Sequence, residues 1–229
     1  MFYPMFLYPS MIILLPGLIL AAYAQFKVKT TYNKYLKVAN QRGITGAETA
    51  SRILKKNGIY DVTVEQVGGK LSDHYDPTKK KLRLSNEVYN GRSIASIAIA
   101  AHEVGHAIQH NKSYAPLTLR STIAPVVGFT SNSAWFLFFI GILFNFPQLM
   151  TLGILFFASA VIFNIVTLPV EFNASSRALT QLESEYLVYD DEGIGVKKVL
   201  NAAALTYVAA TIVAFLQLLR MVLLRGSRD

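Results

Sequence analysis

Residues 91–110, GRSIASIAIAAHEVGHAIQH, predict a buried helix that carries polar residues in an apolar setting. Ser93 is a typical N-cap, and apolar residues recur after it at helical spacing. These apolar residues are Ile94, Ile97, Ala98, Ala101, Val104 and Ile108. The apolar stretch before His102 has only about eight residues, whereas crossing a bilayer takes about 20. We therefore expect this helix to lie inside a folded part of the protein outside the bilayer.

The helix contains the pattern H-E-x-x-H at His102, Glu103 and His106. Histidines four residues apart on a helix point from one face, where both imidazoles can bind one zinc ion. Glu103 is the candidate catalytic base, which takes a proton from a zinc-activated water and passes it to the leaving amine. The alternative is an apolar helix with three ordinary polar residues. Burying them without a metal or partners costs free energy, so the metal site is favoured.

A catalytic zinc keeps three protein ligands and one open position, so a third ligand is needed. His110 continues the four-residue spacing, but a helix places it about 12 Å from His102 along the axis. That separation is too large for one ion, and we expect His110 to lie at the helix end or behind a ligand. The chain has no cysteine, which excludes disulfides and thiolate zinc sites.

The better candidate for the third ligand is Glu171, the carboxylate that directly follows an apolar run. Pro169 suits a helix start or kink just before it, and a glutamate from a second helix completes the site in gluzincin metallopeptidases. The residues expected to share its helix face are Ala174, Ala178 and Leu182. The alternatives are an acidic residue that merely ends a membrane span, or a ligand at Glu183 or Glu185, in a charged run that we expect to be solvated. The ligand set predicts one Zn²⁺ per chain.

The chain is too apolar for an ordinary soluble protein, with 52% hydrophobic residues and a mean hydropathy of +0.36. Four runs are long enough to cross a bilayer: residues 5–24, 123–146, 149–170 and 202–219, the last of which can extend to 224. The first has no basic segment ahead of it and is expected to be a retained anchor. The short uncharged link at 145–148 predicts an antiparallel hairpin of the second and third runs. The fourth run has an alternative interpretation, a buried helix of a soluble core.

The distribution of charge indicates a topology. The chain has 22 basic and 14 acidic residues, a net charge of +8. Basic residues without any acidic one follow the first run: Lys27, Lys29, Lys34, Lys37 and Arg42. The positive-inside rule then places residues 26–121 in the cytosol and predicts a multi-pass protein of the cell membrane. Full crossing by the fourth run would put a basic tail outside the cell. This either argues against that crossing or is a minor violation of the positive-inside rule. The basic stretch forms no nucleic-acid-binding motif, and we expect it to contact anionic lipid headgroups.

The segment between the first two runs has the signature of a small α+β fold. Thr45 and Glu48 have the spacing of a capping box and predict a short amphipathic helix that ends at 57–58. Residues 61–67 and 80–85 alternate apolar and polar and predict two strands. We expect 80–85 to be an edge strand that pairs with an extended peptide substrate. The candidates for stabilising the transition-state oxyanion, or for binding substrate, are His74, Tyr75, Arg177 and Tyr207.

These features predict an α+β membrane protein, mostly helical, with multi-pass helices and a small cytosol-facing, gluzincin-like metallopeptidase unit that carries a short β-sheet. We expect an N-terminal transmembrane anchor at 1–25 and a catalytic part with the sheet and the H-E-x-x-H helix at 26–121. A transmembrane hairpin at 122–170 precedes the third-ligand helix and cytosolic segment at 171–201. The expected last part, 202–229, is an apolar helix with a basic tail.

Five sequence blocks, in order along nearly the whole chain, resemble the YugP-like family of neutral zinc metallopeptidases of bacterial membranes. These blocks are TGAETA, LSDHYDPTKKKLRLS, AAHEVGHAIQH, LPVEFNASSRAL and LNAAALTYVAA. The resemblance implies His102, His106 and Glu171 as zinc ligands and Glu103 as catalytic base. A more distant similarity to the HtpX-like and CAAX prenyl proteases implies a cytosol-facing gluzincin site. Those families carry E-x-x-A-D, where residues 171–175 of this chain read EFNAS.

The leading hypothesis is an integral-membrane zinc endopeptidase that processes membrane proteins or misfolded proteins near the cytosolic surface. A site-2-type intramembrane protease would set its motif within a spanning helix and take an Asp from a later span. The motif helix is too short for that, and no Asp lies in the second, third or fourth run. A catalytically silent membrane scaffold or a metal-dependent chaperone is the other alternative, although Glu103 and all the ligand candidates are present. The sequence predicts a peptide or protein substrate but neither its identity nor an oligomeric state.

Overall fold

The computed structural model describes residues 9–226, and the chain divides into two compact units. The sheet unit comprises Gln25–Thr118 and Pro169–Leu205. The apolar unit comprises Met1–Ala24, Leu119–Leu168 and Thr206–Asp229. Long helices contribute residues to both units, so each unit is described separately below.

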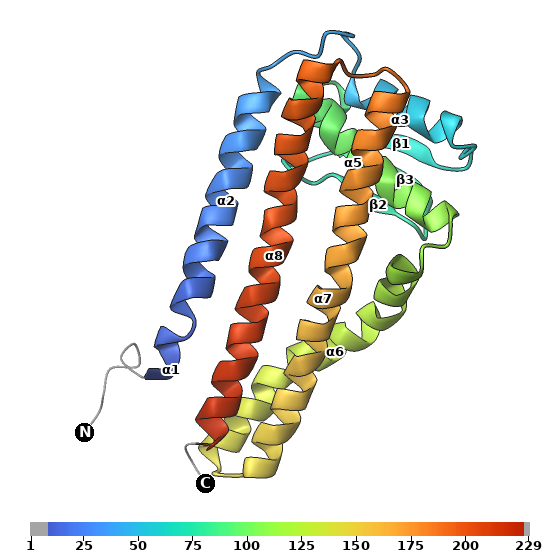
Figure 1. Ribbon diagram of the computed structural model, residues 1–229. Coiled ribbons are helices and arrows are strands. Elements are labelled where there is room, and N and C mark those ends of the chain that lie inside the picture. Colours follow the sequence, from blue (N-terminus) through green and yellow to red (C-terminus); the bar gives the residue numbers. More distant parts are fainter. Residues whose placement is uncertain (1–8, 227–229) are drawn as a thin grey trace. The chain divides into compact units, whose positions relative to one another are not determined.

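The chain is mostly helical, with one small sheet (Figure 1). The elements that precede the H-E-x-x-H motif are α1 (Pro9–Ile12), α2 (Leu15–Leu36), α3 (Gly46–Lys56), β1 (Thr63–Val67), β2 (His74–Asp76), β3 (Lys81–Ser85) and α4 (Asn86–Tyr89). The motif lies on α5 (Ile94–Asn111), which is followed by α6 (Ala115–Leu143), α7 (Pro147–Ser184) and α8 (Asp190–Gly226).

Helix α5 forms the centre of the core of the sheet unit. The apolar positions named above are buried along its whole length: Ile94, Ile97, Ala98, Ala101, Val104 and Ile108. The predicted N-cap is confirmed, because the Ser93 hydroxyl accepts a hydrogen bond from the Ser96 amide. Protein therefore surrounds this helix, and its polar side chains must find their partners inside the unit.

Helix α3 packs against α5 and starts as the sequence predicts. The Thr45 hydroxyl accepts from the Glu48 amide at 3.1 Å, and the Glu48 carboxylate accepts from the Thr45 amide at 2.7 Å. This reciprocal pair is a capping box, and it satisfies two backbone donors at the helix start. Asn57 forms the C-cap, and Gly58 follows with a φ of 69°, which favours glycine.

The sheet has the order β1–β3–β2, with β1 parallel and β2 antiparallel to β3 (Figure 1). The predicted strands are confirmed as β1 and β3, but the expectation that 80–85 is an edge strand is wrong. Strand β3 is central because a third strand, β2, pairs with its other side. This strand was not predicted: it has only three residues, in a turn-rich stretch that lacks the alternation of a longer strand. The edges of the sheet are therefore β1 and β2, and β2 contacts α5.

In the apolar unit, α6 and α7 form the antiparallel hairpin that the sequence predicts. Near the turn, the Gly141 backbone lies against Met150, and farther along the hairpin Trp135 meets Phe157 edge to face, with ring centroids 5.8 Å apart. Asn145, with a φ of 49°, makes the turn. In the second contact both residues lie farther from the turn than in the first, so the two helices run antiparallel.

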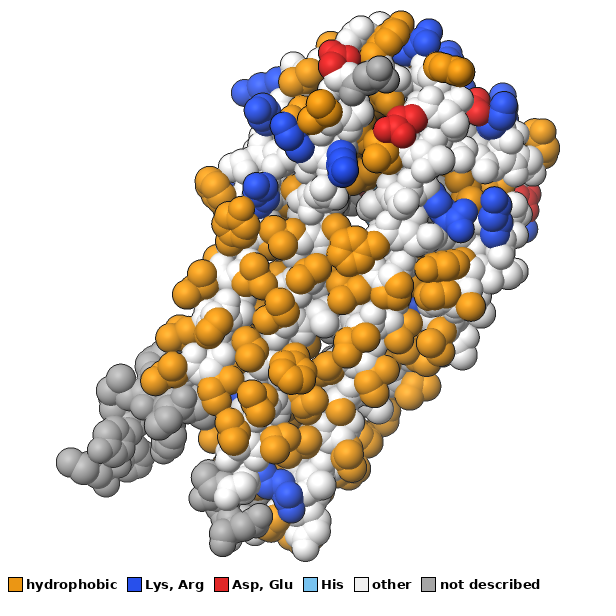
Figure 2. All heavy atoms as spheres, viewed as in Figure 1, with side chains coloured by type: hydrophobic (Ala, Val, Ile, Leu, Met, Phe, Trp, Pro, Cys, Tyr) orange, Lys and Arg blue, Asp and Glu red, His pale blue; other side chains and the backbone are white. Residues whose placement is uncertain are grey.

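Among the described residues, three helical stretches are long and apolar enough to cross a membrane: Ala115–Leu143, Pro147–Ser184 and Asp191–Gly226. They cover the second, third and fourth apolar runs. Only 17% of the apolar window in Asp191–Gly226 is buried, which disfavours the alternative of a buried helix in a soluble core. Apolar side chains cover the visible face of these helices (Figure 2). Residues 5–8 of the first run lie outside the described residues, and α2 is not among the three, so the N-terminal anchor stays a prediction.

Gly153 is a test of the hairpin, because a Cβ there would lie 2.8 Å from the Ala134 carbonyl oxygen and the Phe138 nitrogen. Gly153→Ala must force α6 and α7 apart, and we expect it to destabilise the protein by about 1–3 kcal/mol. The matched control is Gly128→Ala in α6, where a Cβ would meet nothing within 4 Å. Thermal unfolding in detergent should show a lower Tm for the first variant alone. Equal Tm values for the two variants would contradict this packing.

Candidate metal centre

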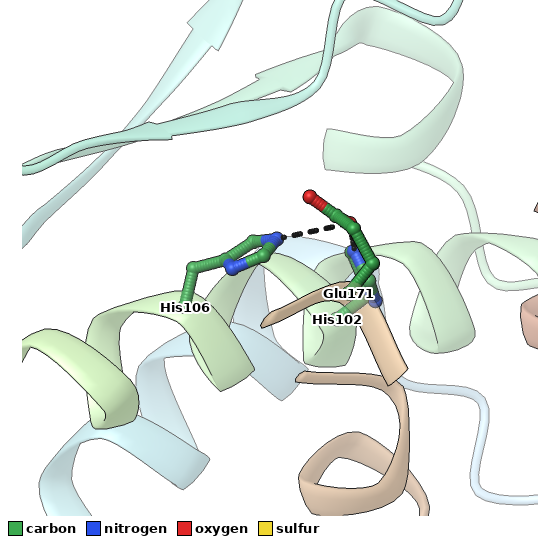
Figure 3. A group of neighbouring side chains, drawn as sticks. All are labelled: His102, His106 and Glu171. Atoms are coloured by element: carbon green, nitrogen blue, oxygen red, sulfur yellow. Dashed lines mark ion pairs between the residues drawn. The ribbon is translucent and has the colours of Figure 1, made fainter. Parts of the chain in front are cut away.

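The structure brings His102, His106 and Glu171 together inside the sheet unit (Figure 3). The two histidines project from successive turns of α5, with their rings edge to face and their centroids 4.8 Å apart. Glu171 comes from α7, and its Oε2 atom lies 3.3 Å from His102 Nε2 and 3.6 Å from His106 Nε2. All three side chains are largely shielded from solvent. The fold therefore brings Glu171 next to two histidines that precede it by 65 or more positions in the chain.

The geometry of this group fits a zinc ion. Ligand atoms about 2.05 Å from a tetrahedral zinc lie about 3.3 Å from one another. The two nitrogen-to-oxygen distances, 3.3 and 3.6 Å, are close to that value, and all the ligand atoms lie within 4.8 Å of one another. Two imidazole nitrogens and one carboxylate oxygen also form a donor set typical of catalytic zinc, with a fourth position left for water or substrate.

The close approach of α5 and α7 depends on Gly105, between the two histidines. A Cβ at this position would lie 2.5 Å from the carbonyl oxygen of Ala174 and 3.1 Å from the Ala174 Cα. The two backbones are thus in direct contact, and even a methyl group would separate them. Because Ala174 follows Glu171 by one turn, this contact places the carboxylate over the pair of imidazoles.

The ring nitrogens that face away from the cluster also have partners. His102 Nδ1 lies 3.2 Å from the Ser175 hydroxyl, and His106 Nδ1 lies 3.0 Å from Gln109 Oε1. The Ser175 hydroxyl thus lies behind the first histidine. Such contacts fix the orientation of a ligating imidazole.

Glu103 is buried beside the first histidine, and its charge acts on its neighbours. Burial lowers the pKa of His106, but the carboxylates of Glu171 and Glu103 outweigh burial and raise that pKa above its ordinary value. Burial raises the pKa of Asp73, and the charge of Glu103 raises it further, against hydrogen bonds from the backbone and hydroxyl of Ser85. Asp73 was not among the predicted site residues, since only the fold brings this loop carboxylate near Glu103.

The candidates for oxyanion stabilisation lie outside the three-residue cluster. The two ring nitrogens of His74 contact the Ser72 carbonyl oxygen and the Arg83 guanidinium. Burial, with the charges of Asp61 and Asp76, raises the pKa of Tyr75 to about 12. Its phenol therefore stays protonated and can donate to His110 Nδ1, which is 2.9 Å away.

Arg177 donates to Asn173 Oδ1 at 2.7 Å on the same helix, and Tyr207 belongs to the apolar unit. His110 lies at the end of α5, against Tyr75 and apart from the other two histidines, as expected. Of the two rival acidic residues, Glu183 is exposed and Glu185 pairs with Lys56 at 3.4 Å.

A cavity of about 290 Å³ opens beside the last turn of α5, between Tyr75, Lys80 and His110.

Comparisons with known proteins agree with this chemistry. A family model described as "Putative neutral zinc metallopeptidase" matches residues 10–226. The chain is also 56% identical over 205 residues to a Bacillus subtilis (strain 168) protein named "Putative membrane protease YugP". The matched region covers 90% of this chain and 91% of the relative. No solved structure matches the chain.

The contact at Gly105 yields a prediction about metal binding. Gly105→Ala should push α7 away from α5 and weaken zinc binding by at least tenfold, because Glu171 then moves off the imidazoles. Gly68→Ala is the matched control, since a Cβ there would meet nothing within 4 Å. Zinc affinity, measured by competition with a chromophoric chelator, should fall in the first variant alone. Unchanged affinity of the Gly105 variant would contradict the role of this contact.

Proposed function

The chain belongs to the neutral zinc metallopeptidase family, and we propose that it is an integral-membrane zinc endopeptidase whose single zinc is held by His102, His106 and Glu171. The observation that carries this proposal is the convergence of the three side chains at distances that suit a tetrahedral ion. Buried imidazoles and a carboxylate without a metal would be costly in an otherwise apolar core. The arrangement corresponds to a gluzincin-type site, with two histidines from one helix and a glutamate from another.

Glu103 is the proposed catalytic base. When bound, zinc supplies Lewis acidity, which acidifies a water and polarises the scissile carbonyl. The Glu103 carboxylate, one residue after a ligand on the same helix, takes a proton from the attacking water and delivers it to the leaving amine nitrogen. Its buried position excludes competing water and strengthens its electrostatic interactions. Glu171, in contrast, is occupied by the two imidazoles and is assigned to metal binding.

An extended peptide is the proposed form of the substrate. Strand β2 is an edge of the sheet and contacts α5, so a peptide can add to it through backbone hydrogen bonds. The cavity beside Tyr75 and His110 lies at the end of the same helix and offers space for a substrate side chain. These features support hydrolysis of a polypeptide.

The membrane gives the proposed enzyme its location. Three span-length helices support a multi-pass protein of the cell membrane, and the basic residues after the first apolar run favour a sheet unit in the cytosol. Helix α5, which carries the motif, is not one of the span-length helices, which disfavours a site-2-type intramembrane protease. A site next to the cytosolic surface suits the processing or quality control of membrane proteins.

Zinc content and proteolysis, measured on the same detergent-purified samples, test the assignment. Glu103→Ala should keep about one zinc per chain and lose casein hydrolysis by at least 100-fold, because it removes the base but no ligand. Glu171→Ala should lose the metal itself. Glu183→Ala, an exposed carboxylate on the same helix, is the control and should keep both. A wild type that binds zinc without any proteolysis would support the scaffold or chaperone instead, and one without zinc would refute the metal site.

A further inference from the structure

Gln109 is a fully buried polar side chain one turn beyond His106 on α5. Its Nε2 donates to the Val170 carbonyl oxygen at 2.7 Å and to Asn173 Oδ1 at 3.0 Å. Its Oε1 lies 3.0 Å from His106 Nδ1. A buried amide without partners costs about 1–3 kcal/mol, whereas this one is hydrogen-bonded on both sides. Its role could not be predicted from the sequence, because a Gln within an apolar helix is not typical of any particular kind of site.

The partners of Gln109 leave its amide only one orientation. Arg177 can only donate, so its contact with Asn173 at 2.7 Å identifies the contacted atom as Oδ1. The same Oδ1 atom faces the Gln109 amide. The Val170 carbonyl can only accept. The amide nitrogen of Gln109 must therefore face these two oxygens, and its own oxygen must face His106.

This orientation also sets the tautomer of His106. A carbonyl oxygen only accepts, so the hydrogen of the contact at 3.0 Å must sit on His106 Nδ1. In the neutral imidazole, Nε2 then carries the lone pair, and Nε2 is the atom that faces Glu171. The Ser175 hydroxyl behind His102 can either donate or accept, and it imposes no such choice.

The same amide holds the third ligand. Val170 and Asn173, its two acceptors on α7, flank Glu171 on either side in the sequence. One side chain of α5 thus fixes the turn of α7 that presents the carboxylate. We propose that Gln109 is a positioning residue that fixes His106 with its proton on Nδ1 and ties Glu171 to α5, an inference that rests on the proposed zinc site.

Gln109→Met tests this role, because methionine keeps the length and volume of the side chain but makes none of the three contacts. We expect zinc affinity, measured by chelator competition in detergent, to fall about 10–100-fold. The control is Gln181→Met, which removes a different amide between helices: Gln181 accepts from Asn57 at 2.6 Å and follows Glu171 by ten residues on α7. The control should keep its zinc affinity even where its Tm falls. Unchanged affinity in Gln109→Met, beside a wild type that binds zinc, would overturn the inference and leave the proposed function intact.

The tautomer provides a readout that does not depend on zinc. With selectively ¹⁵N-labelled histidine, the neutral side chain of His106 in metal-free wild type should show its proton on Nδ1, and Gln109→Met should lose this preference. The wild-type measurement needs no variant, so it tests the inference even where Gln109→Met does not fold. A wild-type proton on Nε2 would overturn the inference, as would an unchanged Nδ1 preference in Gln109→Met. Absence of zinc from the wild type would refute the proposed function separately.

Discussion

The backbone contact between Gly105 and Ala174 is the constraint on which the site depends. It brings α5 and α7 closer than side chains on both surfaces would allow, and it lies one residue before the second histidine and three residues after the glutamate. At this separation, short polar side chains can reach from one helix to the other. A wider separation of the two helices would carry the Glu171 carboxylate away from its present position over the two imidazoles.

Burial makes the polar interactions around this contact interdependent. The sheet unit encloses α5 almost completely, so each imidazole, amide and carboxylate on its α7 side has lost water and must be satisfied by the protein or by a metal. The outer nitrogens of the histidines contact Ser175 and Gln109, and the inner ones face Glu171. Removing one partner therefore leaves another group buried and unsatisfied, so the orientations of these side chains depend on one another.

Sequence reasoning succeeded where the chemistry is local. The Ser93 and Thr45 caps and the apolar periodicity of α5 depend on residues within one or two turns, and the structure confirms them. Glu171 was selected from a distance only because zinc requires a third ligand. The three-residue strand β2, the loop carboxylate Asp73 and the amide Gln109 were missed, because their importance arises from contacts between segments far apart in the chain. The misplacement of 80–85 at the sheet edge followed directly from the missing strand.

The arrangement also explains how a membrane protein can hold a precise site. The boundary between the two units on α7 falls between Leu168 and Pro169, where the proline ring removes a backbone donor from the helix. The contacts described above between Glu171 or its neighbours and Gly105, Gln109 and the two histidines all lie within the sheet unit. The distances between the ligand atoms are therefore fixed by one compact unit alone. The proposed membrane span and the proposed metal site are therefore assigned to different residues of the same long helix.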